Sequence, residues 1–472
     1  MRLCFYSFLL LIQKFILRQN TGKVLYYFAT HMGVVYIKMA QIIAMQNYGN
    51  IFTEEDRLQL SKICDHCNPI AFSKIIKLIE QEYGCSISTK FRHIDSTPLG
   101  AASISQVHRA VLLDGREVAV KIKRRDVTRR VMHDTKQIRR IIHRFGKFAK
   151  FRNYLGSDKA LDFWAKWIEQ ETDFRNEQQN LHIYQDFADS VNGKIENAIQ
   201  IKVPGLVPEL CTDNIIVMEF VTAPTINQLE LTPENKQRIC RGMNDYVKLS
   251  FYALLHGLPV TFHGDPHGGN VYLDKDGNVG FLDLGLIFTF SGEEADYTRQ
   301  LFLDAYNVRT DQLVKLLLQN GKYTNLDPAK YRADVEAQAK RFRSVPTSQF
   351  FIEMINLYTH YNIEPPEITY KLGKAFLALY GMNNFIQNDT NTKDLLAPQI
   401  VEFYLRRAVD DTTSIFTSGL EILPDFLTTA ADKGIISGFS EQILKLDSLK
   451  QQLRTTLEHC DEVLAFFNLK AR

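Results

Sequence analysis

An aspartate, an asparagine and a second aspartate occur in an order that suits transfer of a phosphoryl group. HGDPHGGN, residues 263–270, contains Asp265 and Asn270, and FLDLG, residues 281–285, contains Asp283. Phosphoryl transfer needs a carboxylate that orients or deprotonates the attacking hydroxyl, and an amide and a second carboxylate that hold Mg²⁺ against the phosphates. Mg²⁺ accepts oxygen ligands and keeps several waters, so one amide and one carboxylate are sufficient. We therefore predict that Asp265 acts on the acceptor and that Asn270 and Asp283 bind Mg²⁺.

The spacing of these residues, H-x-D-x-x-x-x-N followed by D-x-G, is typical of protein-kinase-like folds. Aspartate and asparagine also favour turns, which would explain either segment alone but not both in this order. Such a fold needs a strand lysine that contacts the phosphates and a helical glutamate that pairs with it. VAVK ends with Val120 and Lys121, and Glu177 lies in ETDFRNEQQN. We predict that Val120 and Lys121 contact the nucleotide and that Glu177 pairs with Lys121, although either charged residue alone could be a solvated side chain.

An apolar segment supplies a candidate adenine site. IIVMEFV, residues 215–221, predicts a strand that ends near Glu219. In a kinase-like fold the backbone just after this strand binds the adenine, so Glu219 and Val221 are candidate nucleotide-binding residues. The alternative is a buried strand that happens to end in a glutamate.

Local sequence patterns place these motifs in a mixed fold of two lobes. Two β-branched segments, 107–113 and 117–122, flank Asp114-Gly115, which is a strong hairpin signal. Because the strands are joined by hairpins, the pattern argues against a doubly wound parallel sheet. Further strands are expected at 199–203, 214–220, 271–273 and 279–282, and helices over about 70–79, 126–186, 233–256 and from 293 onward. We predict an α+β, bilobal protein-kinase-like fold with a helical N-terminal extension at 1–95, an N-lobe at 96–221 and a mostly helical C-lobe at 222–472.

Four motifs in a fixed order resemble the UbiB/AarF family of atypical protein-kinase-like proteins. The loop PLGAASISQVHRA, residues 98–110, is alanine-rich where ordinary protein kinases have G-x-G-x-x-G. HGDPHGGN is similar to the family's H-A-D-P-H-P-G-N. The remaining matches are Lys38 and Gln41 in VVYIKMAQ, for the K-x-G-Q motif, and Glu171 and Asp173, for the E-x-D motif.

The resemblance implies that the helical N-terminal extension folds over the active site and that Lys38 pairs with Glu171. Gln41 and Asp173 are expected at the same site. Some positions depart from the family pattern: Ala40 replaces a glycine, Gly100 replaces an alanine, and in the catalytic loop Gly264 and Gly269 lie where alanine and glycine or proline, respectively, are usual. None of these changes removes a charged or ligating group. The nucleotide is expected to contact the loop residues Gly100, Ala101, Ala102 and Ser103.

The activity that the resemblance implies is ATP binding with Mg²⁺, followed by hydrolysis or transfer to a small acceptor, in support of ubiquinone or related isoprenoid-lipid metabolism at a membrane. An isoprenoid lipid or quinone precursor, an anionic membrane surface and biosynthetic enzymes are the partners that it suggests. Two alternatives remain: a catalytically weak nucleotide-binding scaffold for biosynthetic enzymes, and a small-molecule phosphotransferase. The second would leave Lys38, Gln41 and the E-x-D motif unexplained.

Charge and cysteine content limit the partners and the compartment. The net charge of +2 over 472 residues gives no general attraction to nucleic acid, and seven cysteines are too few for a disulfide framework. Residues 121–152 hold thirteen basic and two acidic residues, a net of 13 − 2 = +11. The apolar N-terminus has no acidic residue before Glu54. The N-terminus and residues 121–152 could each bind an anionic membrane, or each could be an ordinary helix of the folded protein. We expect a cytoplasmic protein, peripheral at the inner face of a membrane.

A pair of cysteines offers a weaker signal. Cys64-Asp65-His66-Cys67 has the C-x-x-C spacing of a zinc or redox site. A site of four ligands needs a second such pair, and the sequence contains none. Helical spacing explains the motif equally well.

Overall fold

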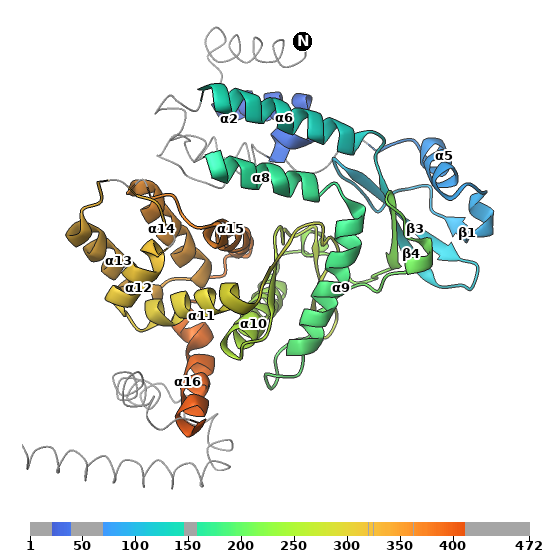
Figure 1. Cartoon of the computed structure of the whole chain (residues 1–472). Coiled ribbons are helices and arrows are strands. Elements are labelled where there is room, and N and C mark those ends of the chain that lie inside the picture. Colours follow the sequence, from blue (N-terminus) through green and yellow to red (C-terminus); the bar gives the residue numbers. More distant parts are fainter. Residues whose placement is uncertain are drawn as a thin grey trace, which may run out of the picture. The chain divides into compact units, whose positions relative to one another are not determined.

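The computed structural model describes residues 21–38, 69–145, 158–319, 321–323, 325–361 and 363–410 (Figure 1). The chain divides into two compact units, residues 1–399 and 400–472. The candidate site lies within the first unit. Gln41, Ala40 and the cysteine pair at 64–67 lie outside the described residues.

A five-stranded antiparallel sheet forms the smaller lobe. Strands β3 and β4 form the predicted hairpin, whose turn at Asp114-Gly115 uses a φ of 93° at Gly115. The sequence did not predict β1, because in FRHI only the two end residues are apolar and the alternation typical of a strand is missing. The structure buries these two end residues and leaves the middle two exposed. The strands are β1 (Phe91–Ile94), β2 (Gly100–Ala101), β3 (Ser105–Leu112), β4 (Glu117–Lys123) and β6 (Ile215–Glu219), in the order β1-β3-β4-β6 with β2 beside β3.

Alternation along β4 gives its two faces different neighbours. Val118, Val120 and Ile122 belong to the core that also contains Ile75 and Ile79 of α5 (Phe72–Tyr83). Successive side chains of a strand point to opposite faces, so Lys121 emerges on the face away from α5. There its ammonium lies 5.6 Å from the centroid of the Phe174 ring, at the start of α9 (Phe174–Val191). The strand thus separates an apolar core from a charged face.

The described part of the charged stretch after the hairpin is helical, as predicted. Its helices are α6 (Val127–Phe145), α8 (Asp158–Gln170) and α9. Asp173 is the N-cap of α9 and accepts a hydrogen bond from the backbone N–H of Arg175. Ahead of the sheet lie α2 (Thr21–Met32) and, after Gly33, a helical segment that carries Lys38.

The larger lobe is mostly helical, also as predicted. Its helix α15 buries residues on all sides, and Phe376 of this helix stacks on Phe351 of α14 with 4.1 Å between ring centroids. Phe376 also packs against Phe262, at 5.3 Å. The helices are α10 (Pro233–Leu255), α11 (Gly292–Tyr306), α12 (Thr310–Leu318), α13 (Pro328–Phe342), α14 (Thr347–His360), α15 (Glu367–Ile386) and α16 (Thr392–Asp410).

Two small sheets hold the loops that carry the aspartates. The first joins β7 (Val260–His263) to β10 (Ile287–Phe290), and the second contains β8 (Val271–Leu273) and β9 (Val279–Phe281), with β5 (Ile201–Lys202) parallel to β9. Residues 264–270 connect β7 to β8, and residues 282–286 connect β9 to β10. The two loops therefore leave neighbouring elements and can meet.

None of the described helices is long and apolar enough to cross a membrane. The divisions at residues 95 and 221 stay predictions. The α+β, kinase-like fold is what the structure shows.

Candidate functional site

His263 ties the two aspartate loops together. Its Nδ1 accepts a hydrogen bond from the backbone N–H of Asp265 at 2.9 Å, so the ring proton lies on Nε2, which donates to the carbonyl of Asp283 at 2.6 Å. Burial lowers the pKa of His263 to about 4, which keeps the ring neutral near pH 7. The histidine thus acts as a fixed brace between the two loops, a role that the sequence motif contained but that we did not predict.

Lys121 is held by two carboxylates at once. Its Nζ lies 2.6 Å from Oε1 and 2.8 Å from Oε2 of Glu177, which confirms that the two residues contact, and 3.0 Å from Oδ2 of Asp283. Lys121 and Glu177 are buried, whereas the Asp283 side chain is 39% exposed. The strand lysine, the α9 glutamate and the 282–286 loop therefore converge on one point.

The protonation of this trio follows from burial and from its net negative charge. Burial alone lowers the pKa of Lys121, but Asp283 and Glu177 outweigh it and raise the pKa above its usual value. Burial raises the pKa of Glu177 to about 7 in spite of Lys121, and the nearby Asp283 adds to the rise. For Asp283, the effect of burial is outweighed by Lys121 and by the N–H of Gly285, which lower its pKa to about 2. Asp283 thus stays charged.

Lys38 bridges two carboxylates of different elements. Its Nζ lies 3.2 Å from Oε2 of Glu171, the contact expected from the family resemblance, and 3.3 Å from Oδ2 of Asp265, which was not expected. All three side chains are largely buried. The other residue of the E-x-D motif, Asp173, is an exposed helix cap whose charge acts on Lys123. The structure therefore brings Lys38 and Glu171 to the aspartate loop and gives Asp173 a structural role.

The alanine-rich loop is a tight turn between β2 and β3. Gly100 pairs with Val107 and Ala101 with Gln106, and the N–H of Ala102 donates to the carbonyl of Ser105. The Ala102 carbonyl accepts a hydrogen bond from Nε of Arg124 at 2.8 Å, which anchors the loop to the end of β4. Ser103 lies at the bend of this turn. The contact of the loop with a nucleotide stays a prediction.

Val120 faces the wrong way for the contact that we predicted. Its side chain is fully buried in the core beside α5, because neighbouring residues of a strand point to opposite faces. Ala119 is the residue that shares the face of Lys121, and the sequence VAVK already contained this signal. At the end of β6, the backbone of Glu219 donates to the carbonyl of Gly205 at 2.7 Å, and Val221 follows in the connection.

The loops offer a ligand set that fits Mg²⁺. Nδ2 of Asn270 donates to the carbonyl of Asp265 at 3.4 Å, so its amide oxygen is the atom that it can offer to a metal. Asp283 offers a partly exposed, charged carboxylate. The described part of the chain contains no cluster of three or more His, Cys, Asp or Glu side chains with metal-binding geometry. One amide and one carboxylate suit a metal that also takes phosphate oxygens and waters, and they do not suit zinc.

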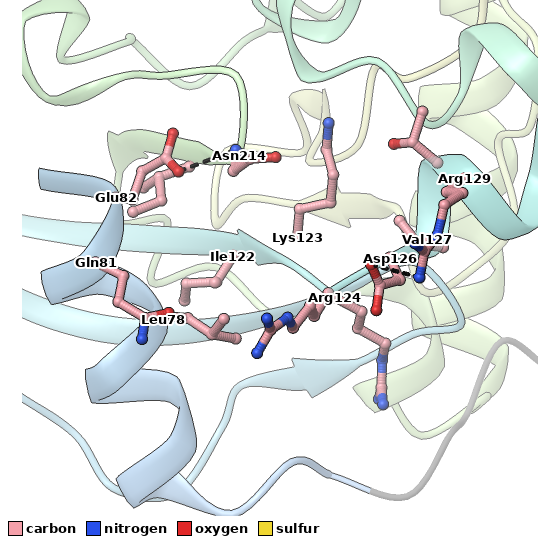
Figure 2. Close-up of a pocket in the computed structure, with 13 residues that line it drawn as sticks. Leu78, Gln81, Glu82, Ile122, Lys123, Arg124, Asp126, Val127, Arg129 and Asn214 are labelled. Carbon is pink, nitrogen blue, oxygen red and sulfur yellow. Dashed lines mark hydrogen bonds and ion pairs between the residues drawn. The ribbon is translucent and has the colours of Figure 1, made fainter.

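A separate pocket adjoins β4 from the side of α5. Figure 2 shows this pocket, with a volume of about 420 Å³, between α5, the end of β4 and the start of α6. Leu78 and Ile122 form apolar parts of its lining, while Lys123, Arg124 and Arg129 give it basic groups. Glu82 and Asp126 also line it, but each is engaged, Glu82 by Asn214 and Asp126 by Arg129. The pocket therefore lies next to the strand of Lys121 but outside the trio of ion pairs.

Comparison with known proteins decides the family. Residues 62–317, more than half of the chain, match the ABC1 atypical kinase-like domain. The chain belongs to this family. The match confirms the resemblance to UbiB/AarF proteins and the kinase-like fold.

Several ABC1-family relatives come from plants. The chain is 28% identical over 309 residues to Protein ACTIVITY OF BC1 COMPLEX KINASE 7, chloroplastic, of Arabidopsis thaliana, which covers 64% of this chain and 41% of that protein. It is 29% identical to an aarF domain-containing protein kinase of the same plant, in a match that covers 56% of this chain and 35% of that protein. Among solved structures, an erythromycin complex from Mycobacterium tuberculosis has a TM-score of 0.45 and 20% identity, covering 72% of this chain and 87% of that chain. The match thus spans less than half of the length of either plant protein.

Proposed function

We propose that this ABC1-family protein is a Mg²⁺-dependent, ATP-binding atypical kinase or ATPase. The observation that carries the proposal is the position of Lys121, which pairs with Glu177 and also contacts the metal-binding candidate Asp283. A lysine placed between a helical glutamate and a loop aspartate is the arrangement that binds ATP phosphates in kinases. Bound Mg²⁺ would neutralise the charge of the phosphates and hold them in one orientation.

Each residue of the site has a task in this proposal. Glu177 holds the Lys121 side chain in one conformation, so binding the phosphates costs less side-chain entropy. His263 keeps the loop of Asp265 in register with the loop of Asp283. Asp265 orients the attacking hydroxyl or water and accepts its proton. Asn270 and Asp283 would hold the metal, which would offset the charge of the phosphates.

The contact between Lys38 and Asp265 argues for a small acceptor. Oδ2 of Asp265 is covered by the Lys38 ammonium at 3.3 Å, and Lys38 is itself tied to Glu171. A hydroxyl on a folded protein would have to displace this buried lysine before it could reach the carboxylate. We therefore favour hydrolysis of ATP, or transfer to a small molecule, over phosphorylation of proteins.

A role in ubiquinone or related isoprenoid-lipid metabolism at a membrane belongs to the same proposal. Helix α6 presents exposed basic residues, among them Arg130, Lys136 and Arg140, together with Met132, which is 59% exposed. A basic surface with an apolar residue suits an anionic bilayer. A comparison of quinone content in cells with and without the gene tests this part, and equal content would contradict it.

A catalytically weak nucleotide-binding scaffold is the second candidate. Two lysines lie near Asp265, and burial, which alone would raise its pKa, is outweighed by Lys374 and Lys38, so the pKa lies well below its usual range. A carboxylate so stabilised in its charged form is a weak base. This observation favours slow turnover unless Lys38 moves.

The decisive experiment measures phosphate release and ATP binding with purified protein. Asp283→Asn should abolish the tightening of ATP binding by Mg²⁺, because a neutral amide offsets less of the phosphate charge, and phosphate release should fall at least tenfold. Calorimetric titration with and without Mg²⁺ gives the binding constants. Asp276→Asn, in an exposed turn, is the control and should behave as wild type. Mg²⁺-dependent ATP binding without phosphate release in the wild type would support the scaffold, and an unchanged metal dependence in Asp283→Asn would remove Asp283 from the site.

A further inference from the structure

Asp265 has a lysine at each of its carboxylate oxygens. Lys38 lies 3.3 Å from Oδ2, and Lys374 lies 3.9 Å from Oδ1. Lys374 comes from α15, more than one hundred residues after Asp265 in the sequence. Neither the sequence motifs nor the family resemblance singled it out.

Lys374 is unusual for a helical lysine because its side chain is only 10% exposed. Burial of an ammonium is costly unless an opposite charge compensates it. Within the described part of the chain, Asp265 is the carboxylate that lies within ion-pair distance of Lys374. The cost of burying this lysine is therefore tied to the charge of Asp265.

The position of Lys374 is fixed by aromatic packing. Its neighbour Phe376 is stacked on Phe351 and packs against Phe262 of β7, the strand that leads into the loop of Asp265. Interiors of this kind are close-packed and do not deform easily. Helix α15 thus holds the Lys374 ammonium at a set distance from the aspartate loop.

The two lysines differ in how they contact Asp265. Lys38 is shared with Glu171 and lies on a segment that precedes the N-lobe. An acceptor that approaches Oδ2 must displace Lys38, whereas Lys374 lies at the other oxygen. At 3.9 Å, Lys374 is too far to donate a hydrogen bond to Asp265, so it supplies charge without blocking an oxygen.

We propose that Lys374 is a positioning residue for Asp265, which holds the carboxylate in place when Lys38 gives way to the acceptor. This inference rests on the proposed function. When Lys38 has moved away, Lys374 of α15 still compensates the charge of Asp265. Besides Lys374, the titratable groups that face Asp265 are Lys38 with its partner Glu171, His263 and His267.

The test is ATP turnover by Lys374→Met, which removes the charge but keeps a long apolar side chain. Without the cation, Asp265 loses the group that holds its carboxylate in place, so kcat should fall about tenfold while KM for ATP stays within about twofold. Lys374→Arg, which restores the charge, should return kcat most of the way to the wild-type value.

A matched control lies on the same helix. Lys371 is also partly buried, and its Nζ lies 2.5 Å from Oε1 of Glu294, away from Asp265. Lys371→Met should leave kcat unchanged. If Lys371→Met lowers kcat as much as Lys374→Met does, the effect reflects general loosening of α15 and the inference is wrong.

A second measurement covers the case in which Lys374→Met folds poorly. In a double-mutant cycle with Asp265→Asn, Lys374→Met should destabilise the protein less than it does in the wild type, because Asp265 no longer needs a counter-ion. Additive losses in melting temperature would overturn the inference. Wild-type protein without ATP turnover would contradict the enzymatic proposal, while the cycle would still decide whether Lys374 and Asp265 are coupled.

Discussion

Two buried residues of the site change their pKa in opposite directions on folding. Burial raises the pKa of Glu177 from 4.5 to about 7 and lowers that of His263 from 6.5 to about 4. Between these values the folded protein holds a proton on Glu177 that the unfolded chain has lost, so this residue makes stability fall as pH rises. His263 does the reverse, because there the unfolded chain holds the extra proton. The two contributions therefore oppose each other in the same pH range.

Glu177→Gln should expose the contribution of His263. The variant loses overall stability because Lys121 keeps only Asp283, but its free energy of unfolding should rise more steeply than that of the wild type, by about 2 kcal/mol from pH 5 to 6.5. Urea denaturation at several pH values measures the slope. Glu293→Gln, at an exposed position at the start of α11, is the control and should run parallel to the wild type. Parallel curves for Glu177→Gln would show that Glu177 ionises normally.

At the scale of elements, α9 depends on the cap that precedes it. Asp173→Ala should cost about 1 kcal/mol of stability, because the N–H of Arg175 loses its acceptor at the start of the helix that carries Glu177. Asp173→Ser keeps a capping oxygen and should restore both the melting temperature and ATP turnover. Thermal melts and phosphate release on both variants distinguish a capping role of Asp173 from a catalytic one. A serine variant with normal melting but tenfold lower turnover would return Asp173 to the catalytic machinery, as the family resemblance implies.

The sequence predicted those elements whose signals are local. The hairpin of β3 and β4 followed from Asp114-Gly115, and the contact between Lys121 and Glu177 followed from motifs that a kinase-like fold brings together. Val120 was predicted to contact the nucleotide, but alternation along VAVK places its side chain in the core beside α5. β7 and β10, at 260–263 and 287–290, were not predicted, because they are only four residues long and pair across an intervening hairpin.

Lys374 could not have been predicted in this way. Residues 372–379 of α15 are all buried, so no amphipathic pattern singles out Lys374. Its partner lies in a loop that is remote in the sequence, and only the packed aromatic residues bring the two together. Contacts of this kind are set by tertiary structure.

Over the whole molecule, the charge is small but unevenly distributed. The net charge is +2, yet residues 121–152 contribute +11, so the rest of the chain carries −9. The double variant Arg130→Glu, Lys136→Glu should lose most binding to vesicles that contain anionic lipid, and wild-type binding should weaken with salt because charges are screened over about 10 Å at 0.1 M. Flotation on anionic and neutral vesicles measures this. Lys315→Glu, Lys330→Glu, at exposed positions of α12 and α13, is the matched control. Equal flotation of both double variants would contradict a docking role for α6.

The distance along the chain between Asp265 and Lys374 also sets an order of events during synthesis. The ribosome adds 374 − 265 = 109 residues between the two. At typical rates of translation this takes roughly 5 to 20 s. Through that interval the nascent chain already has Lys38, Glu171 and Asp265, but it lacks the helix that brings the second cation. If the aspartate loop folds within that interval, it folds with Lys38 as its only lysine counter-charge of the two, and its final electrostatic environment forms when α15 packs.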